Sequence, residues 1–295
     1  MQFGVSIPHY GGPLSVDAMR ETVQRAESLG YDSAWVGDHV ITPQHFLTGI
    51  GPNFYDAFVV LSHMAAFTRR LRLGTSVIVL PYRSPLVVAK MVATLDALSG
   101  GRVILGVGAG NAPDEFKALG VPEAARGART NEYLRAMIAL WTQEPASFSG
   151  RFVEFSGVHF QPRPAQTPHP PIWVGGHSDG ALQRAVRFGE AWHSGGMALE
   201  RMAQTVARLR QFAEAAGRRD GPAVTTRMTV QFLDGVQGGE PRRPGRGAAD
   251  QIRKDLLGYR DLGVSHVVCG FGGRLGPEFA AAMERFASEV APALA

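Results

Sequence analysis

Residues 70–111 read RLRLGTSVIVLPYRSPLVVAKMVATLDALSGGRVILGVGAGN, and this stretch decides the fold. The run at 71–80 is almost wholly apolar, which is typical of a strand covered on both faces. Ser84-Pro85 then opens a segment of helical periodicity, which ends at the paired glycines Gly100-Gly101. A second apolar run follows at 103–107. This order of strand, helix and strand predicts two parallel strands joined by a crossover helix.

The same strand–helix unit recurs along the chain, and we count eight copies. The expected strands lie at 3–8, 33–37, 71–80, 103–107, 172–174, 191–193, 225–233 and 265–270. The expected helices lie at 16–29, 54–68, 84–98, 130–141, 179–188, 199–216, 249–262 and 277–289. Eight consecutive units predict an α/β fold of the (β/α)8 TIM-barrel type, with residues 1–295 as a single domain. A doubly wound open sheet is the alternative, which we disfavour because no G-x-G-x-x-G follows the first strand.

Two stretches depart from this repeat. Residues 148–160, FSGRFVEFSGVHF, alternate apolar and polar side chains and carry two glycines, which predicts a short β-hairpin inserted before the fifth strand. Residues 238–247, GGEPRRPGRG, follow the seventh strand, and their Gly, Pro and Arg content predicts an irregular loop. Its arginines Arg242, Arg243 and Arg246 suit either an extended anionic ligand or a solvated loop.

Composition limits the class of protein. The 295 residues are 45% apolar and 19% charged, which predicts a folded chain with a sizeable core. Thirty Lys and Arg against 26 Asp and Glu leave a formal charge of +4, and no basic stripe interleaved with aromatics suggests a nucleic-acid partner. No apolar run is long enough to span a bilayer, and the opening MQFGVSIPHY lacks the basic and apolar regions of a signal peptide. We therefore expect a cytoplasmic protein without membrane contact.

Several chemistries are disfavoured by missing motifs. The sequence has no H-E-x-x-H, and its single cysteine, Cys269, excludes both a cysteine-rich metal site and an internal disulfide. We therefore expect no metal centre. The absence of G-x-S-x-G and of a lysine at a strand end disfavours a hydrolase or a Schiff-base aldolase.

In barrel enzymes the loops that follow the strands bind the substrate, so the residues just beyond each strand end are the candidates. Asp38 and His39 are the one adjacent carboxylate–imidazole pair at such a position. Because an imidazole titrates near neutral pH, we take both as candidate catalytic residues. The structural alternative is that Asp38 caps a turn while His39 only packs.

Two glycine-rich turns at strand ends are candidate cofactor contacts. Residues 175–178 lie between the fifth strand and its helix, where free backbone N–H groups and the helix dipole suit a phosphate. The turn at 106–111 lets the backbone approach a flat ring closely. Each turn is also compatible with a purely structural role.

Three segments carry a family resemblance. They are residues 27–39, ESLGYDSAWVGDH; residues 70–111, quoted above; and residues 170–193, PPIWVGGHSDGALQRAVRFGEAWH. In joint order and spacing they resemble the luciferase-like monooxygenase superfamily, and in particular its oxidoreductases that use the deazaflavin coenzyme F420. The resemblance implies a (β/α)8 barrel that holds a flavin-like ring at the carboxyl ends of its strands and transfers hydride. It also implies a bulge in the third strand, with a non-proline cis peptide bond behind the ring at Ser76-Val77.

Together with the two turns, the resemblance implies one set of cofactor contacts: Asp38, His39, Thr75, Ser76, Val77, Gly108, Asn111, Gly175, Gly176, His177 and Ser178. Relatives commonly form homodimers through barrel helices, for which the apolar segment 54–67 is a candidate. The expected partners are thus a small-molecule substrate and a second copy of the chain.

Two positions depart from members that oxidise glucose 6-phosphate. Those members carry a Glu proton donor in the turn after the fourth strand, where this sequence has Asn111. The Trp that they carry four residues after the His is replaced by Pro43. The sugar-phosphate activity is therefore not expected.

The leading hypothesis is an F420-dependent oxidoreductase that transfers hydride between the deazaflavin and a small organic substrate, with His39 handling a proton. An FMN-dependent monooxygenase, which uses reduced flavin and oxygen, is the alternative on the same barrel. A third reading is a flavin-binding protein without catalysis.

Overall fold

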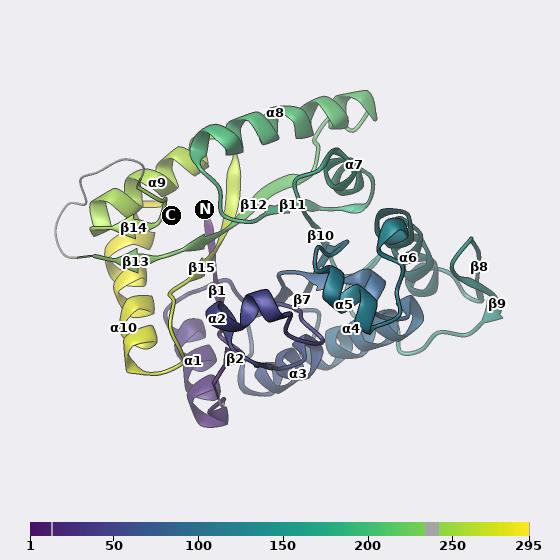
Figure 1. The fold of residues 1–295 in the computed structure, drawn as a ribbon, viewed down its shortest axis with the longest axis horizontal. Helices are drawn as coiled ribbons and strands as arrows, with labels where there is room; N and C mark the ends of the chain where they lie inside the picture. Colours follow the sequence, from purple (N-terminus) through teal and green to yellow (C-terminus); the bar gives the residue numbers. More distant parts are fainter. Residues whose placement is uncertain (13, 234–241, 295) are drawn as a thin grey trace.

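Eight parallel strands close into a barrel in the computed structural model, which describes residues 1–12, 14–233 and 242–294 (Figure 1). In order they are β1 (Gln2–Ser6), β3 (Ser33–Val36), β5 (Arg72–Thr75), β7 (Val103–Gly108), β10 (Ile172–Gly175), β11 (Ala191–Ser194), β12 (Ala223–Thr229) and β15 (Val264–Gly270). Pairing of β15 with β1 and of β7 with β10 closes the sheet. The (β/α)8 barrel that the sequence predicts is therefore confirmed.

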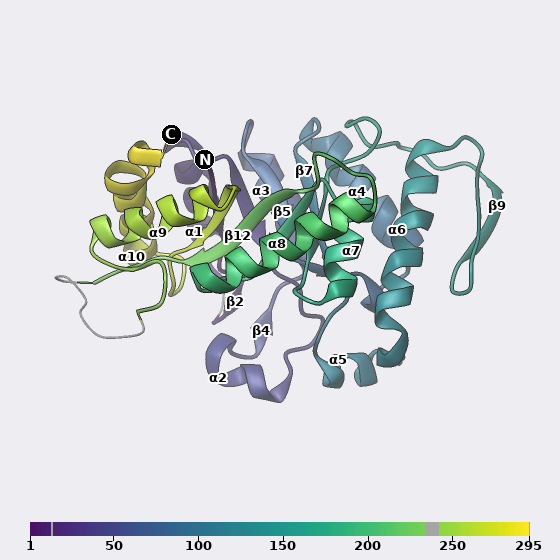
Figure 2. The ribbon, with the colours of Figure 1, turned by 90° about the horizontal axis from the view of Figure 1, so that it is seen from above.

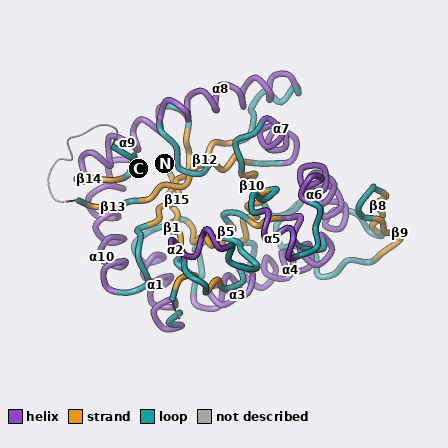
Figure 3. Tube along the Cα trace, viewed as in Figure 1, coloured by secondary structure: helices purple, strands orange, loops and turns teal. Residues whose placement is uncertain are grey.

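Helices follow the strands and surround the barrel, as the ring of purple segments around the orange strands shows (Figure 3). They are α1 (Val16–Ser28), α3 (Ala57–Phe67), α4 (Pro85–Ser99), α6 (Arg126–Thr142), α7 (Asp179–Phe188), α8 (Leu199–Ala215), α9 (Ala249–Asp261) and α10 (Pro277–Arg285). The hairpin predicted before the fifth strand is present as the antiparallel pair β8 (Ala146–Ser149) and β9 (Glu154–Val158). A parallel pair of short strands, β13 (Gln231–Phe232) and β14 (Arg246–Gly247), lies after β12.

Short elements cover the carboxyl end of the barrel. There β2 (Tyr10–Gly11) pairs with β4 (Asn53–Phe54), and the helices α2 (Leu47–Ile50) and α5 (Pro113–Ala118) lie at the same end (Figure 2). Figure 2 shows these elements opposite the two chain termini. The predicted helix at 54–68 starts later than expected, because Phe54 belongs to β4 and the Asp56 carboxylate caps α3 by accepting from Phe58 N and Val59 N.

The third strand is interrupted within the predicted run at 71–80, where the resemblance implied a bulge. The strand stops at Thr75 and resumes as β6 (Ile78–Val79). The peptide bond between Ser76 and Val77 is cis, as the family resemblance implied. An apolar run indicates that side chains are buried, and side chains are buried in a bulged strand as well as in a regular one. The run alone therefore does not reveal the interruption.

Trp35 fills the interior of the barrel because the strands on either side of its own, β1 and β5, each carry a glycine beside the indole ring. A Cβ on Gly4 would lie 2.4 Å from Trp35 Nε1, and one on Gly74 would lie 2.3 Å from Trp35 Cε3. The Trp35 ring packs on Trp173 with centroids 4.7 Å apart and stacks on His193 at 5.4 Å. Aromatic rings rather than a channel therefore occupy the barrel below the strand ends.

No helix in the described ranges has the length and apolar character needed to cross a membrane. Over the same ranges, no group of three or more His, Cys, Asp or Glu side chains is placed to hold a metal ion.

Candidate active site

A hollow of about 850 Å³ opens at the carboxyl ends of β3, β6, β7 and β10, the end at which barrel enzymes place their active sites. Ten of the eleven predicted site residues line it: Asp38, His39, Ser76, Val77, Gly108, Asn111, Gly175, Gly176, His177 and Ser178. The eleventh, Thr75, is buried beneath the bulge, where its hydroxyl donates to Gly106 O at 2.7 Å. The fold thus gathers residues from four strand ends, and their roles there stay predictions.

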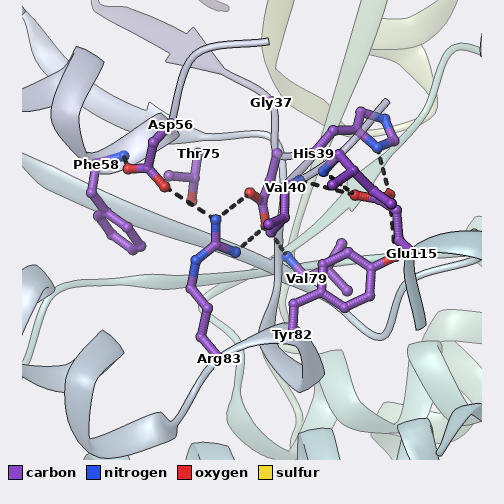
Figure 4. A network of polar contacts seen from close by, with 12 residues as sticks. Gly37, His39, Val40, Asp56, Phe58, Thr75, Val79, Tyr82, Arg83 and Glu115 are labelled. Atoms are coloured by element: carbon purple, nitrogen blue, oxygen red, sulfur yellow. Dashed lines mark hydrogen bonds and ion pairs between the residues drawn. The ribbon is translucent and has the colours of Figure 1, made fainter. Parts of the chain in front are cut away.

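A buried carboxylate holds the His39 imidazole. His39 Nδ1 lies 2.7 Å from Glu115 Oε2, and the Glu115 side chain is almost fully enclosed. The backbone N–H groups of Val40 and Ile41 donate to Glu115 Oε1 at 2.9 and 3.3 Å, and the Tyr82 hydroxyl donates to Oε2 at 3.3 Å. Figure 4 shows His39, Val40 and Tyr82 converging on Glu115.

This contact fixes which nitrogen of His39 carries a proton. A carboxylate only accepts, so Nδ1 donates to Glu115 and Nε2 of the neutral ring keeps a lone pair. The His39 side chain is 21% exposed and lines the hollow, with the rings of Phe46 and Phe54 packed against it at 5.1 and 5.0 Å. A carboxylate–imidazole pair of this kind can accept a proton from a bound ligand.

Asp38 is held by a different set of partners. Arg83 Nη1 and Nη2 donate to the two carboxylate oxygens of Asp38 at 2.7 and 2.8 Å, and Val79 N donates to Oδ2 at 2.9 Å. Arg83 also reaches Asp56 Oδ2 at 3.2 Å, so it joins the end of β3 to the start of α3 (Figure 4). These bonds occupy the Asp38 carboxylate and favour a positioning role, in which it fixes the third strand beyond the bulge.

Buried hydrogen bonds inside the barrel hold the bulge of the third strand. Ser76 Oγ lies 2.9 Å from His193 Nε2, and His193 Nδ1 lies 2.9 Å from Thr225 Oγ1. Val77 packs against strand ends that carry glycine, since a Cβ on Gly108 would lie 2.8 Å from Val77 Cγ2. Backbone thus forms the hollow's wall at this point, and a flat ring can approach it closely.

The turn after β10 presents an exposed helix N-terminus. Ser178 caps α7, its hydroxyl accepting from Ala181 N at 3.3 Å, and a Cβ on Gly180 would meet only open space. The His177 ring lies beside Trp192, and burial lowers the pKa of His177 from its ordinary value. The free N–H groups and the helix dipole make this end of the hollow suitable for an anion.

Arg184 strengthens the positive character of that end. It lies on α7 and lines the hollow, and its guanidinium donates to Asn131 Oδ1 at 2.7 Å and to Gly127 O at 3.1 Å. Among the described residues it takes part in no ion pair. A buried guanidinium without a carboxylate partner is suited to a ligand phosphate.

Sequence reasoning missed the charged residues Glu115, Arg184 and Arg227 of this region. Glu115 follows Asn111 by one helical turn, and recognising α5 in residues 113–118 would have placed it at the same strand end. Nothing in the sequence marks Arg184 as different from the other arginines.

The predicted arginine-rich loop overlaps residues 234–241, which lie outside the described ranges. Of its arginines, Arg242 forms an ion pair with Asp255 and donates to Arg246 O at 2.6 Å, which ties it to α9. Arg243 and Arg246 line a separate hollow of about 460 Å³ beside Met228. A contact between this loop and an anionic cofactor tail stays a prediction.

The fold and this site define a (β/α)8 barrel with a cofactor-sized hollow, glycine turns and a carboxylate-held histidine at its carboxyl end. The chain belongs to the luciferase-like monooxygenase family, whose family model matches residues 1–236. An uncharacterized protein of Mycobacterium tuberculosis is 35% identical over 260 residues, which cover 83% of this chain and 82% of that protein.

Two relatives of named activity differ in cofactor. The FMNH(2)-dependent dimethylsulfone monooxygenase of Pseudomonas putida is 32% identical over 206 residues, 68% of this chain and 55% of that protein. The F420-dependent glucose-6-phosphate dehydrogenase of Kineococcus radiotolerans is 36% identical over 203 residues, 67% of this chain and 58% of that protein.

Solved structures agree on the fold. The monooxygenase RslO1 from Streptomyces bottropensis superposes with a TM-score of 0.86 over the whole of both chains at 24% identity. The coenzyme F420-dependent tetrahydromethanopterin reductase from Methanopyrus kandleri gives a TM-score of 0.82 at 19% identity, covering 100% of this chain and 99% of that one. Family members thus include F420-dependent enzymes and flavin monooxygenases.

Proposed function

We propose that this protein is an F420-dependent oxidoreductase that transfers hydride between the deazaflavin and a small organic substrate. The observation that carries the proposal is the His39–Glu115 pair, which aims a proton acceptor into the same hollow as the glycine turns. When an alcohol is oxidised, a hydride and a proton leave it, and the proton needs an acceptor. His39 Nε2 is the acceptor, and in the reverse direction the protonated ring returns the proton.

The residues present fit a tricyclic ring with a phosphate-bearing tail. When bound, the deazaflavin supplies the ring carbon that exchanges hydride. The bulge at Ser76-Val77 and the backbone at Gly108 would support the ring, while Ser178, Gly180 and Arg184 would hold the phosphate. The hollow's volume of about 850 Å³ lies within the range usual for cofactor sites.

The main alternative is an FMN-dependent monooxygenase. It is favoured by the dimethylsulfone monooxygenase, whose identity to this chain is close to that of the F420-dependent relative. The same glycine turn and arginine would hold the FMN phosphate. In this alternative reduced flavin reacts with oxygen, so the two proposals differ in their co-substrate.

Fluorescence titration of the purified protein with F420 and, separately, with FMN and reduced FMN tests the proposal. We expect F420 to bind at least tenfold more tightly than either flavin. Arg184→Met should weaken F420 binding about tenfold, because it removes one charge-assisted contact to phosphate. Arg187→Met is the matched control, since Arg187 lies on the same helix with its guanidinium over the Phe188 ring. A preference for FMN would overturn the F420 proposal in favour of the FMN-dependent monooxygenase. No binding of either cofactor would overturn both enzyme proposals.

We also propose that two copies associate through α3 and α4. Val59 on α3 is 67% exposed, and Leu86 and Val87 on the adjacent α4 are 37% and 53% exposed. Such apolar side chains on neighbouring helices suit an interface. Light scattering should give a dimer mass that Val59→Arg reduces, and a monomer mass for the unaltered protein would contradict the proposal.

A further inference from the structure

A second hollow adjoins the candidate active site. It measures about 520 Å³ and is bounded by the loops after β1, β12 and β15 and by the segment at 47–52. Ser6, Tyr10 and Arg227 line both hollows, so the two meet at these side chains. These three side chains form the boundary between the two hollows.

Arg227 lies at the junction with few partners. Arg227 is partly buried near the end of β12, and within the described ranges its guanidinium makes one long hydrogen bond, from Nη1 to Ser76 O at 3.4 Å. None of the ion pairs between described residues includes it. An arginine stays protonated even here, so the junction carries a positive charge without a fixed counter-charge.

Arg274 adds a second charge at the rim of the same hollow. A Cβ on Gly12 would lie 2.8 Å from Arg274 Cζ, so the guanidinium packs directly on the backbone of the loop after β1. Arg274 is also absent from the ion pairs between described residues. No Asp or Glu occurs among the described residues that line the hollow.

Among the described residues, arginines without an acid also line the hollow beside Met228, but that hollow shares no lining residue with the candidate active site. Another hollow of about 880 Å³, near the start of β12, also contains arginines, among them Arg210 and Arg219, but Glu214 and Asp220 line it with them. The hollow beside the active site has two arginines, no acid and the rings of Tyr10, Phe271 and Phe279. Aromatic walls with a positive end suit an organic body that ends in an anion.

We propose that this second hollow is the subsite for an anionic group of the substrate, a carboxylate or a phosphate ester, held by Arg227 and Arg274. The proposal rests on the proposed function in assigning the first hollow to the cofactor. The substrate's organic body then passes Tyr10 and presents its reacting carbon to the first hollow. Both arginines act by binding and orienting the substrate.

The anionic group of the cofactor is the other possible occupant, and the geometry disfavours it. The exposed turn at 176–178 leads into α7, which follows β10 and carries Arg184. Arg227 belongs to β12, two strands further around the barrel. A phosphate at α7 leaves Arg227 and Arg274 available to a second molecule.

Binding of hexanoate, with hexanamide as its neutral counterpart and inorganic phosphate as a third probe, tests the proposal. Calorimetry or ligand-observed NMR should show hexanoate binding to the cofactor-free protein at least tenfold more tightly than hexanamide. Arg227→Met and Arg274→Gln should each weaken hexanoate binding about tenfold, as expected for loss of one charge-assisted contact. Arg227→Lys should restore part of the affinity, which a loss of folding would not allow.

Arg219→Gln is the matched control, because this arginine lies in the hollow at the opposite end of β12, and it should leave hexanoate binding unchanged. Hexanoate should still bind when the cofactor is saturating. Competition between hexanoate and the cofactor would overturn the proposal by assigning Arg227 to the cofactor's own anion. Equal binding of hexanoate and hexanamide would also overturn it. If neither F420 nor FMN binds while the arginine-dependent binding of hexanoate persists, the proposed function fails and the anion subsite stands.

Discussion

Ser76 Oγ lies 2.9 Å from His193 Nε2, and this bond joins the bulged third strand to the sixth strand across the barrel interior. The Thr225 hydroxyl donates its one proton to Trp192 O at 3.2 Å, so it can only accept from His193 Nδ1. Nδ1 therefore carries the proton, and Nε2 accepts from the Ser76 hydroxyl. This arrangement of donors and acceptors is that of a neutral His193.

The first prediction concerns pH. Burial lowers the pKa of His193 from 6.5 to about 3, and the pKa of His266 falls to about 3 for the same main reason. Between these pH values the unfolded chain binds a proton that the folded chain excludes, so the free energy of unfolding falls as the pH falls below 6.5. The slope is at most about 1.4 kcal/mol per pH unit for each histidine. Urea unfolding from pH 8 to pH 4 measures it.

The His193→Gln variant separates this effect from general acid unfolding. It should be less stable at pH 8, because the bonds to Ser76 and Thr225 are lost, but its stability should fall less steeply with acid. His169→Gln, on the connector before β10, is the control and should keep the unaltered slope. Parallel curves for His193→Gln and the unaltered protein would show that His193 does not contribute.

The second prediction concerns Glu115. Glu115→Gln removes the charge that favours the Nδ1-protonated form of His39, so ¹⁵N NMR should show a smaller share of that tautomer. Once a substrate is known, kcat should fall by about tenfold to a hundredfold with little change in KM, since the residue acts through His39. Tyr82→Phe removes only a 3.3 Å bond to the same carboxylate and should have a much smaller effect. An unchanged tautomer in Glu115→Gln would contradict this role.

Local sequence patterns are enough to predict the barrel and, with the family resemblance, most of the residues brought together at the candidate site. Apolar runs bounded by glycines mark the strands, and the residues after them, such as His39 and Gly176, meet at one end because parallel strands share their direction. Glu115 was not predicted because its contact with His39 spans 76 residues and its helix α5 has only six. The role we propose for Arg227 could not be predicted from the sequence either, because it depends on the absence of a nearby carboxylate among the described residues.

The third prediction concerns the room made for Trp35. Gly74→Ala should destabilise the fold by about 3 kcal/mol, because the new methyl group would lie 2.3 Å from the indole ring. The closely packed barrel leaves the Trp35 ring no room to move away. Gly49→Ala, where a Cβ meets nothing within 4 Å, is the control and should be nearly neutral. Denaturant unfolding of both variants measures the difference, and equal stabilities would show that Trp35 can move.

The fourth prediction concerns Asp38. If its role is to hold the bulge through Arg83, Asp38→Asn should destabilise the fold by about 3 kcal/mol. The substitution leaves the half-buried Arg83 guanidinium with one remaining ion pair among the described residues, to a single carboxylate oxygen of Asp56. Glu289→Gln breaks the exposed pair with Arg285 and should change stability by less than about 1 kcal/mol. Direct proton transfer by Asp38 predicts the opposite pattern, with stability retained and kcat lost. Urea unfolding beside steady-state kinetics of Asp38→Asn therefore decides between a positioning and a catalytic Asp38.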